Sequence, residues 1–581
     1  MRHGAKPLFG WPALLLSAPL LAFAHPVGAQ PRFGPGEERP ELEEFEPDEA
    51  PPSPLELPPI PPPIEVAPDR LSAGRAVFIR AFEIEGSTVF GAEELGDAVA
   101  SYTGRAISSE ELLDAKEAIT AYYAERGYVT SGAVIPDQTV ENGVVRIEIV
   151  EGGLTDVRVE GARWFRPRYF RDRLMLAGGP PVNAARLERV LQRFQRNPRV
   201  VRVDARLVPG ARRGESILLL AVEEMPRMSV GLAVANDEPP SIGGVAGHFS
   251  MDFPNILGVD DIVSGTIAVT EGLREYDLFY TLPINAYDTT LGLEFIDSDS
   301  EVVEFPIDVT SRSRTFGITL RHPLLRQRGQ ELWLGLTGER RQSESKLFGV
   351  TTCFQSGVFD CTPVVSVLRV TQDWNYRSRS DVLAARSTLS IGIPVLGATT
   401  SGSSELPDSQ FVAWLGQLQW AHVIPRWWQS ELLFRVDTQL ANDPLLALEK
   451  FALGGMRTVR GYRENELVRD NAVVASLELR IPVLRDPVGR PLVQLAPFAD
   501  FGRGWDNEIG LSSDNLASLG VGLRLAPWDW LRGEFYWGGR LTRSHRRGDD
   551  LQDHGFHFRV TVTPAGLVSP RGGPRRRYGP K

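Results

Sequence analysis

The residues whose types and spacing suggest chemistry lie in one arginine- and glycine-rich segment, residues 451–464. It contains Arg457, Arg460 and Arg463, and each guanidinium can bind a carboxylate through two parallel hydrogen bonds. Its three glycines permit tight backbone bends: Gly454, Gly455 and Gly461. The segment lies in a connection of roughly thirty residues, which is too long for a simple hairpin. We therefore expect a long loop whose arginines need acidic partners if it folds inward.

Carboxylates on neighbouring stretches are the candidate partners of these arginines. Within residues 493–502, alternation places five residues on the polar face: Gln494, Ala496, Phe498, Asp500 and Gly502. Glu478 and Asp437 occupy the polar faces of their own stretches. A half-buried carboxylate on such a face requires a cation, and Arg460 with Asp500 is one such pairing. Charge pairing alone leaves the other combinations of these groups open.

The elements around these residues are short alternating stretches that recur from Met228 almost to the end of the chain. We count about sixteen of them, an even number as expected for a closed bacterial outer-membrane barrel. In residues 432–440, for example, apolar side chains alternate with Arg435, Asp437 and Gln439. The pattern predicts a 16-stranded antiparallel transmembrane β-barrel over residues 226–564, with a polar lumen. A large soluble β-sandwich or propeller would show the same alternation.

The lengths of the connections favour the barrel over a soluble sheet. Connections after even-numbered strands are short, such as 254–261 and 283–288, whereas those after odd-numbered strands are often long. Besides the arginine-rich loop, we expect long loops at four places: 297–312, 339–363, 396–409 and 541–554. Short periplasmic turns and long outer loops are typical of outer-membrane barrels. The arginine-rich loop therefore belongs to the outer side.

The two cysteines of the chain, Cys353 and Cys361, both lie in one of these long loops. In an oxidising export compartment we expect a local disulfide, with two free thiols as the alternative. A metal site has little support, because no second Cys/His pair is nearby. The formal net charge of −11 argues against a nucleic-acid partner.

The chain begins with a pattern typical of exported proteins. In residues 1–29, basic residues precede an apolar core and then several small residues, which predicts a secretory signal peptide. A membrane anchor is the alternative, but three prolines interrupt a core that is short for a membrane span. Residues 30–75 are acidic and then proline-dense, which predicts an extended linker. At the other end, residues 565–581 form a basic tail for which we expect no fixed structure.

Between linker and barrel, two segments show the same order of elements, β-α-α-β-β, at a spacing of about seventy residues. The first module covers residues 76–151 and the second covers 152–225. The predicted first strand of the first module is 77–85, and its second helix is 109–126. Each module should place helices over a three-stranded sheet with an edge that can pair with an extended peptide. Most natural edges, however, are protected.

Two motifs give the chain a family resemblance. The first consists of Gly454, Gly455, Val459, Arg460, Gly461 and Tyr462. It resembles the loop signature of two-partner secretion transporters, the TpsB family, which includes haemolysin secretion/activation proteins of the ShlB/FhaC/HecB type. The second motif matches the Phe-x-Asp-x-Gly strand motif of this family: Phe498, Asp500 and Gly502. The resemblance covers nearly the whole mature chain and identifies the two modules as polypeptide-transport-associated (POTRA) modules.

The resemblance implies a loop folded back into an outer-membrane barrel, with Arg460 at its tip paired with Asp500. Arg457 and Arg463 would then have supporting or solvated roles. It also implies that the POTRA modules capture a secreted exoprotein of the adhesin or haemolysin type in the periplasm. The barrel, embedded in outer-membrane lipid, would conduct this partner outward unfolded. No ATP-binding signature is visible and no cofactor is expected, so transport would depend on diffusion and on folding of the partner outside.

Other functions fit the sequence less well. An assembly or insertion factor like BamA, a relative of the TpsB family, is the main alternative, although it usually carries more POTRA modules. We find no Gly-x-Ser-x-Gly or His-Glu-x-x-His motif, and the eight histidines are scattered, so an enzyme is not expected. A passive porin would not need periplasmic modules. Residues 30–50 are acidic and interrupted by proline, so the N-terminal plug helix found in many family members is not expected here.

Overall fold

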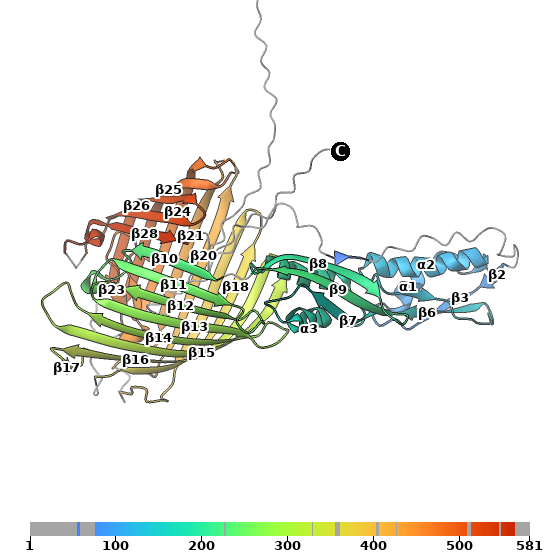
Figure 1. Cartoon of the computed structure of the whole chain (residues 1–581), viewed down its shortest axis with the longest axis horizontal. Helices are drawn as coiled ribbons and strands as arrows, with labels where there is room; N and C mark the ends of the chain where they lie inside the picture. Colours follow the sequence, from blue (N-terminus) through green and yellow to red (C-terminus); the bar gives the residue numbers. More distant parts are fainter. Residues whose placement is uncertain are drawn as a thin grey trace, which may run out of the picture.

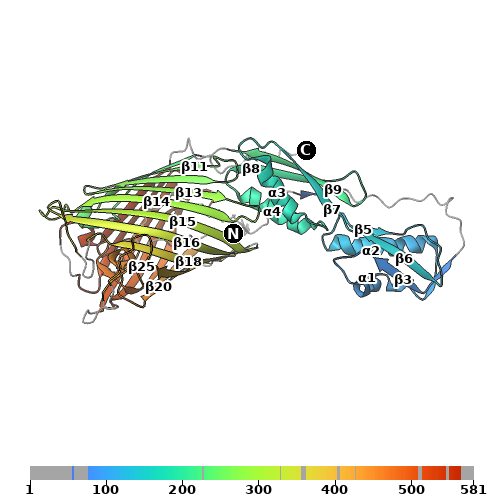
Figure 2. The same cartoon turned by 90° about the horizontal axis from the view of Figure 1, so that it is seen from below.

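The computed structural model describes residues 55–57 and 76–563, apart from 226–227, 328, 355–360, 402–405, 426, 488, 508–512 and 545–547. The predicted signal peptide, the predicted tail and all of the predicted linker except residues 55–57 lie outside this part of the chain. No helix in the described ranges is both long enough and apolar enough to cross a membrane. The described residues form a barrel and two small modules, with the second module between the barrel and the first (Figures 1 and 2).

The first module packs two helices against a three-stranded sheet in the order β3-β6-β5. Its elements are β2 (Val77–Ile79), β3 (Ala81–Glu85), α1 (Ala92–Ala98), η1 (Ala100–Tyr102), β4 (Arg105–Ile107), α2 (Ser109–Glu125), β5 (Gly132–Val134) and β6 (Val144–Val150). The strand predicted over 77–85 is divided at Arg80, so that β2 pairs with β4 and β3 pairs with β6. Helix α2 begins at a capping box of Ser108 and Glu111.

The second module repeats this arrangement and adds one strand. Its elements are β7 (Gly153–Glu160), α3 (Pro167–Ala177), α4 (Ala184–Arg196), β8 (Val200–Pro209) and β9 (Glu215–Glu224). Phe170 and Leu187 of the two helices are fully buried over the sheet. Its sheet has the order β1-β8-β9-β7, because β1 (Leu55–Glu56) pairs in parallel with β8. The linker therefore supplies an extended segment to the edge of this sheet.

Sixteen of the remaining strands form the predicted closed antiparallel barrel, in which β10 pairs with β28. Its strands are β10 (Ser229–Ala235), β11 (Ala246–Pro254), β12 (Ile262–Val269), β13 (Leu273–Pro283), β14 (Thr290–Glu301), β15 (Val309–Gln327), β16 (Gln330–Leu347), β18 (Val364–Arg377), β19 (Asp381–Gly392), β20 (Val412–Ile424), β21 (Ser430–Ala441), β24 (Asn471–Arg485), β25 (Pro491–Trp505), β26 (Asp514–Trp528), β27 (Leu531–Arg540) and β28 (Phe556–Val562). Alternation separates the faces as expected: Leu477 and Phe501 are exposed outside, whereas Glu478 and Asp500 are buried inside.

Two of the predicted long loops are partly strand, which corrects the sequence-based boundaries. Strands β14, β15 and β16 extend into residues 297–312 and 339–363, so the connection between β14 and β15 covers only 302–308. Charged pairs across the ladder support this extension, because Asp297 accepts hydrogen bonds from Arg312 (2.8 Å) and Arg314 (3.0 Å). Beyond β16, β17 (Val350–Thr351) forms a short hairpin extension. The disulfide between Cys353 and Cys361 lies in the same connection.

Candidate functional site

The long connection between β21 and β24 folds back into the barrel. It contains η3 (Ala447–Glu449), β22 (Phe451–Leu453) and β23 (Leu467–Arg469), and the two short strands pair with each other. The segment between these strands is held by buried apolar side chains: Leu453, Val459 and Tyr462 pack with Val474 and Leu516 of the barrel wall. The arginine-rich loop is thus an ordered element inside the barrel.

Arg460 lies at the centre of a buried polar network. Its Nε and Nη2 donate to the two carboxylate oxygens of Asp500, each at 2.8 Å, and its backbone N–H donates to Asp500 Oδ2 at 3.0 Å. Its Nη1 donates to Glu478, and its Nη2 also donates to Ser476 Oγ at 3.0 Å. The geometry therefore selects Arg460 with Asp500 among the pairings that charge alone left open, and it adds Glu478 as a second acidic partner.

Aromatic rings complete the surroundings of this guanidinium. Its carbon lies 3.6 Å from the ring centroid of Phe498 and 4.8 Å from that of Tyr536, distances at which a cation is attracted by the ring face. The Arg460 side chain is 2% exposed and that of Asp500 is fully buried. Removing one partner of such a buried pair costs about 3–5 kcal/mol, because the other charge is left uncompensated. The contact therefore holds the tip of the loop firmly.

The glycines of both motifs are required by close contacts. Gly461 has a φ of +94°, and a Cβ there would lie 2.6 Å from the carbonyl oxygen of Gly538 on β27. Gly502 faces Val459, whose Cγ2 would lie 2.8 Å from an added Cβ. Gly454 and Gly455 form the start of the turn, where their N–H groups donate to Thr458 Oγ1 (2.8 Å) and to the Val459 carbonyl (3.2 Å). The Tyr462 hydroxyl contacts Thr542 Oγ1 at 2.7 Å.

The two other arginines of the loop differ from each other. Arg463 is buried and donates from Nε and Nη2 to the two oxygens of Asp553, each at 2.6 Å. Asp553 belongs to η4 (Leu551–His554), in the connection between β27 and β28. Arg457 is partly exposed, and its Nη2 lies 3.9 Å from Asp237. Of the supporting or solvated roles expected for Arg463, the structure excludes the solvated one and agrees with a supporting one, because a bidentate carboxylate offsets the cost of its burial.

A second anchor of the same connection was not predicted from the sequence. Glu449 of η3 is buried and accepts hydrogen bonds from Arg369 Nη2 on β18 at 2.8 and 3.0 Å. Arg369 also donates to Glu339 on β16 at 3.1 Å. Strands β19, β20 and β21 separate this part of the wall from β24. The loop therefore contacts the barrel through ion pairs at two separate places. Asp437, the third candidate carboxylate, is buried on β21.

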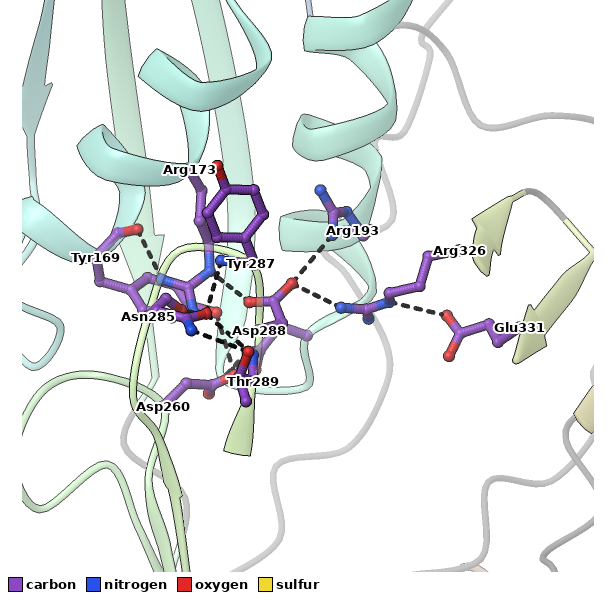
Figure 3. Close-up of polar contacts among 11 residues, drawn as sticks. Tyr169, Arg173, Arg193, Asp260, Asn285, Tyr287, Asp288, Thr289, Arg326 and Glu331 are labelled. Carbon is purple, nitrogen blue, oxygen red and sulfur yellow. Dashed lines mark hydrogen bonds and ion pairs between the residues drawn. The ribbon is translucent and has the colours of Figure 1, made fainter. Parts of the chain in front are cut away.

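A further network joins the second module to two turns of the barrel (Figure 3). In the turn after β13, Asp288 accepts hydrogen bonds from Arg173 of α3 (2.7 Å), Arg193 of α4 (3.0 Å) and Arg326 of β15 (2.6 Å). The turn after β11 places Asp260 against the second module as well. No pattern in the sequence pointed to this junction, because the partners are far apart in the chain.

Asp260 makes the second half of this junction. It accepts hydrogen bonds from the Tyr169 hydroxyl (3.1 Å) and from Asn197 Nδ2 (2.9 Å), and it also pairs with Arg199. Burial and the nearby Asp260 carboxylate raise the pKa of Tyr169, so its phenol stays protonated and remains a donor. Both helices of the second module are thereby tied to the same end of the barrel.

Comparisons with known proteins agree with this architecture. A family model described as haemolysin secretion/activation protein ShlB/FhaC/HecB matches residues 214–525, and one described as a POTRA domain of the ShlB type matches 77–152. The outer membrane transporter CdiB of Escherichia coli is 25% identical over 493 residues, which cover 79% of this chain and 80% of CdiB. The heme/hemopexin transporter protein HuxB of Haemophilus influenzae is 23% identical over 458 residues, covering 75% of this chain and 78% of HuxB.

Solved structures show the same fold. CdiB from Escherichia coli superposes with a TM-score of 0.65 at 21% identity, covering 86% of this chain and 94% of CdiB. BamA from Haemophilus ducreyi lacking POTRA domains 1–3 superposes with a TM-score of 0.52 at 15% identity, covering 84% of this chain and 100% of that chain. Since the first family match spans more than half of the sequence, this chain belongs to the ShlB/FhaC/HecB family of outer-membrane two-partner secretion transporters, with its POTRA modules in the periplasm.

Proposed function

We propose that the POTRA modules of this transporter recognise a secreted exoprotein, of the adhesin or haemolysin type, in the periplasm. The barrel then conducts this partner unfolded to the cell surface without ATP. The fold-back loop controls whether the lumen of the barrel is open to the partner. The observation that carries the proposal is the buried contact between Arg460 and Asp500. A barrel that holds its own loop inside through buried ion pairs can conduct a polypeptide only if that loop is repositioned or passed.

The sheet edges of the modules support recognition of an extended segment. The pairing of β1 with β8 is one example of an extended strand at such an edge, since Leu55 and Glu56 align with Ala205 and Arg206. Edge pairing through the backbone is a common way to bind extended peptides, with side-chain pockets providing selectivity. An unfolded exoprotein presents many such segments, so binding at an edge suits this type of partner.

The charges of the lumen support passage of a polypeptide of mixed composition. Charged side chains on the inner wall pair with one another: Asp373 binds both Arg321 (3.0 Å) and Arg386 (2.6 Å). On neighbouring strands, Glu339 binds Arg369. Conduction requires interactions that are weak enough to be left again, and paired wall charges bind passing groups less strongly than single charges do. No enzymatic step is part of this proposal.

The energy for export comes, in this proposal, from the partner itself. Folding of the exoprotein outside removes the unfolded form from the exit, which draws further chain outward by mass action. We assign residues 1–29 to a signal peptide, 30–75 to a linker and 565–581 to a basic C-terminal tail. Residues 76–151 and 152–225 are the two POTRA modules and 226–564 the barrel.

Deletion of residues 77–151 tests the recognition step. In a pull-down with periplasmic fragments of a candidate exoprotein, the deletion should abolish binding. The barrel should still insert, which is checked by its heat-modified migration in gels. A chain lacking residues 565–581 serves as the truncation control and should bind normally. Retained binding after the first deletion would move recognition to the second module or the barrel. A second experiment tests the independence from ATP: the exoprotein should still cross the membrane of proteoliposomes that contain this transporter but no nucleotide.

A further inference from the structure

A loop of the second module presents an exposed tryptophan among arginines. Trp164 is 56% exposed, although the next residue, Phe165, is buried in the core of the module. Four exposed arginines accompany it: Arg163, Arg166, Arg168 and Arg171. Asp172 is the one acidic residue among positions 162–172, and it pairs with Arg168 at 2.8 Å. An exposed indole in cationic surroundings indicates a surface that contacts a partner.

Hydrogen bonds of the loop backbone fix the exposed position of Trp164. One carboxylate oxygen of Glu224, at the end of β9, accepts hydrogen bonds from the N–H groups of Arg163 (3.0 Å), Trp164 (2.6 Å) and Phe165 (3.3 Å). The backbone is therefore held at three successive residues while the indole points away from the core. The fold thus presents this side chain at a defined place.

That place is the periplasmic end of the barrel. The Arg166 N–H donates to the carbonyl of Gly258, in the turn between β11 and β12, at 2.8 Å. A Cβ at Gly258, where φ is +75°, would lie 3.0 Å from the carbonyl oxygen of Trp164, so the two loops are in close contact. The contacts of Asp260 and Asp288 hold helix α3 beside the same turns (Figure 3).

Apolar and aromatic side chains continue around this end of the barrel. Ile256 and Leu257 are exposed on the turn that contacts the Trp164 loop. Turns and a strand end on the same side of the barrel carry four further exposed tryptophans: Trp427, Trp428, Trp528 and Trp530. Tryptophan girdles of this kind mark the level of the lipid headgroups in outer-membrane barrels. The loop of the second module thus lies next to a surface that faces the membrane.

We infer that residues 163–168 of the second module contact the periplasmic leaflet of the outer membrane, with Trp164 among the phospholipid headgroups. The arginines of the loop complement anionic headgroups, and their side chains are long enough to reach the interface. The contact fixes the second module to the bilayer as well as to the barrel. This contact with lipid requires no exoprotein, so it can be tested independently of the proposed export mechanism.

A fluorescent probe beside the tryptophan tests this contact in the full chain. Because Cys353 and Cys361 form a disulfide, Arg163→Cys introduces a single free thiol for an environment-sensitive label. The labelled protein is placed in nanodiscs of phosphatidylcholine, with or without phosphatidylglycerol, that carry a nitroxide on the headgroup. We expect several-fold stronger quenching than for a label at Leu176→Cys, an exposed position of the same module. Quenching should approach that of Trp428→Cys on the rim of the barrel.

Two further variants distinguish contact with lipid from contact with a protein. Adding Trp164→Ala to the labelled chain should reduce quenching several-fold. We expect anionic phosphatidylglycerol to increase quenching of the label at 163, and Arg166→Gln with Arg168→Gln should remove this increase. Both arginine positions are exposed, and heat-modified migration in gels checks that the barrel stays folded. Quenching at 163 that equals quenching at 176 overturns the proposal. If lipid has no effect but an exoprotein fragment shields the label, the surface binds protein and the proposal is also overturned.

Discussion

Asp500 and Asp288 both bind arginines from another part of the molecule, but in opposite surroundings. Asp500 is fully buried in the barrel wall and receives Arg460 through two parallel hydrogen bonds. Asp288 lies at a turn, where its side chain is 17% exposed, and it receives single hydrogen bonds from three arginines. The first site joins a loop to the lumen, whereas the second joins a module to the rim.

The difference between these sites concerns how the binding energy is distributed. Inside the barrel, one guanidinium makes a bidentate contact with one carboxylate in a medium that screens charge poorly, so loss of either group removes that bidentate contact in one step. At the rim, three arginines share the partly exposed carboxylate, and the arginines repel one another. The pKa of Arg193 is accordingly lowered, because burial and the neighbouring Arg326 disfavour its charged form. We therefore expect loss of Asp500 or Arg460 to release the loop in one step. Loss of single arginines at Asp288 should weaken the junction between the second module and the barrel in small steps.

The largest effect should follow from Asp500→Ala. The substitution leaves Arg460 buried with only Glu478 and Ser476 as partners, and it should weaken loop docking by about 3–5 kcal/mol. Hydrogen exchange of the amides in residues 451–464, followed by mass spectrometry, should become roughly a hundredfold faster or more. Arg457→Ala, which removes a partly exposed arginine of the same loop, is the matched control and should change exchange little. Equal exchange in the Asp500 variant and the parent would contradict the inner half of the comparison.

A smaller effect should follow from Asp288→Ala. The loss of three charge-assisted hydrogen bonds at a partly exposed site should weaken the junction by about 1–3 kcal/mol. Nitroxide labels at Leu176→Cys and Trp528→Cys report the distance between the second module and the barrel. The distribution of this distance should broaden in the Asp288 variant. Asp529→Ala, at an exposed turn aspartate, provides the control. An unchanged distribution would mean that Asp260 and the chain connection suffice to hold the module.

The smallest effect should follow from Arg193→Ala. Two arginines remain on Asp288, and the removed one is about one-third exposed and repelled by its neighbours, so the junction should lose at most about 1 kcal/mol. The same distance measurement should give a distribution close to that of the parent chain. Broadening of the distance distribution as large as in the Asp288 variant would show that the junction depends on Arg193 alone. Asp288 would then resemble Asp500 in depending on a single arginine.

Much of the fold could be predicted from the sequence because barrel strands alternate strictly. Leu477 and Phe501 outside, with Glu478 and Asp500 inside, follow directly from a period of two. Alternation does not show where pairing ends, however. Strands β14 to β16 extend into the residues predicted as loops. Cross-strand partners such as Asp297 and Arg312 stabilise the pairing of the strands there.

The candidate site was predictable only where a motif or a face marked it. Arg460 and Asp500 lie in motifs, but Glu449 lies in a stretch with no motif, and its partner Arg369 is one of many lumen arginines. Asp288 and Asp260 lie in turns and have positive φ values, which their residue type explains without any partner. Their partners lie between 38 and 115 residues away in the chain, so only the folded structure brings these groups together.

Secretion by the Arg460→Ala and Asp500→Ala variants tests the central claim most directly. The claim is that the fold-back loop, held by this ion pair, controls export through the barrel. The measurement is the amount of exoprotein in the medium relative to the amount of heat-modifiable barrel in the outer membrane, with Arg457→Ala as the control. We predict that secretion falls strongly in both variants while the barrel inserts normally and the control still secretes. Normal secretion by both variants would contradict this claim.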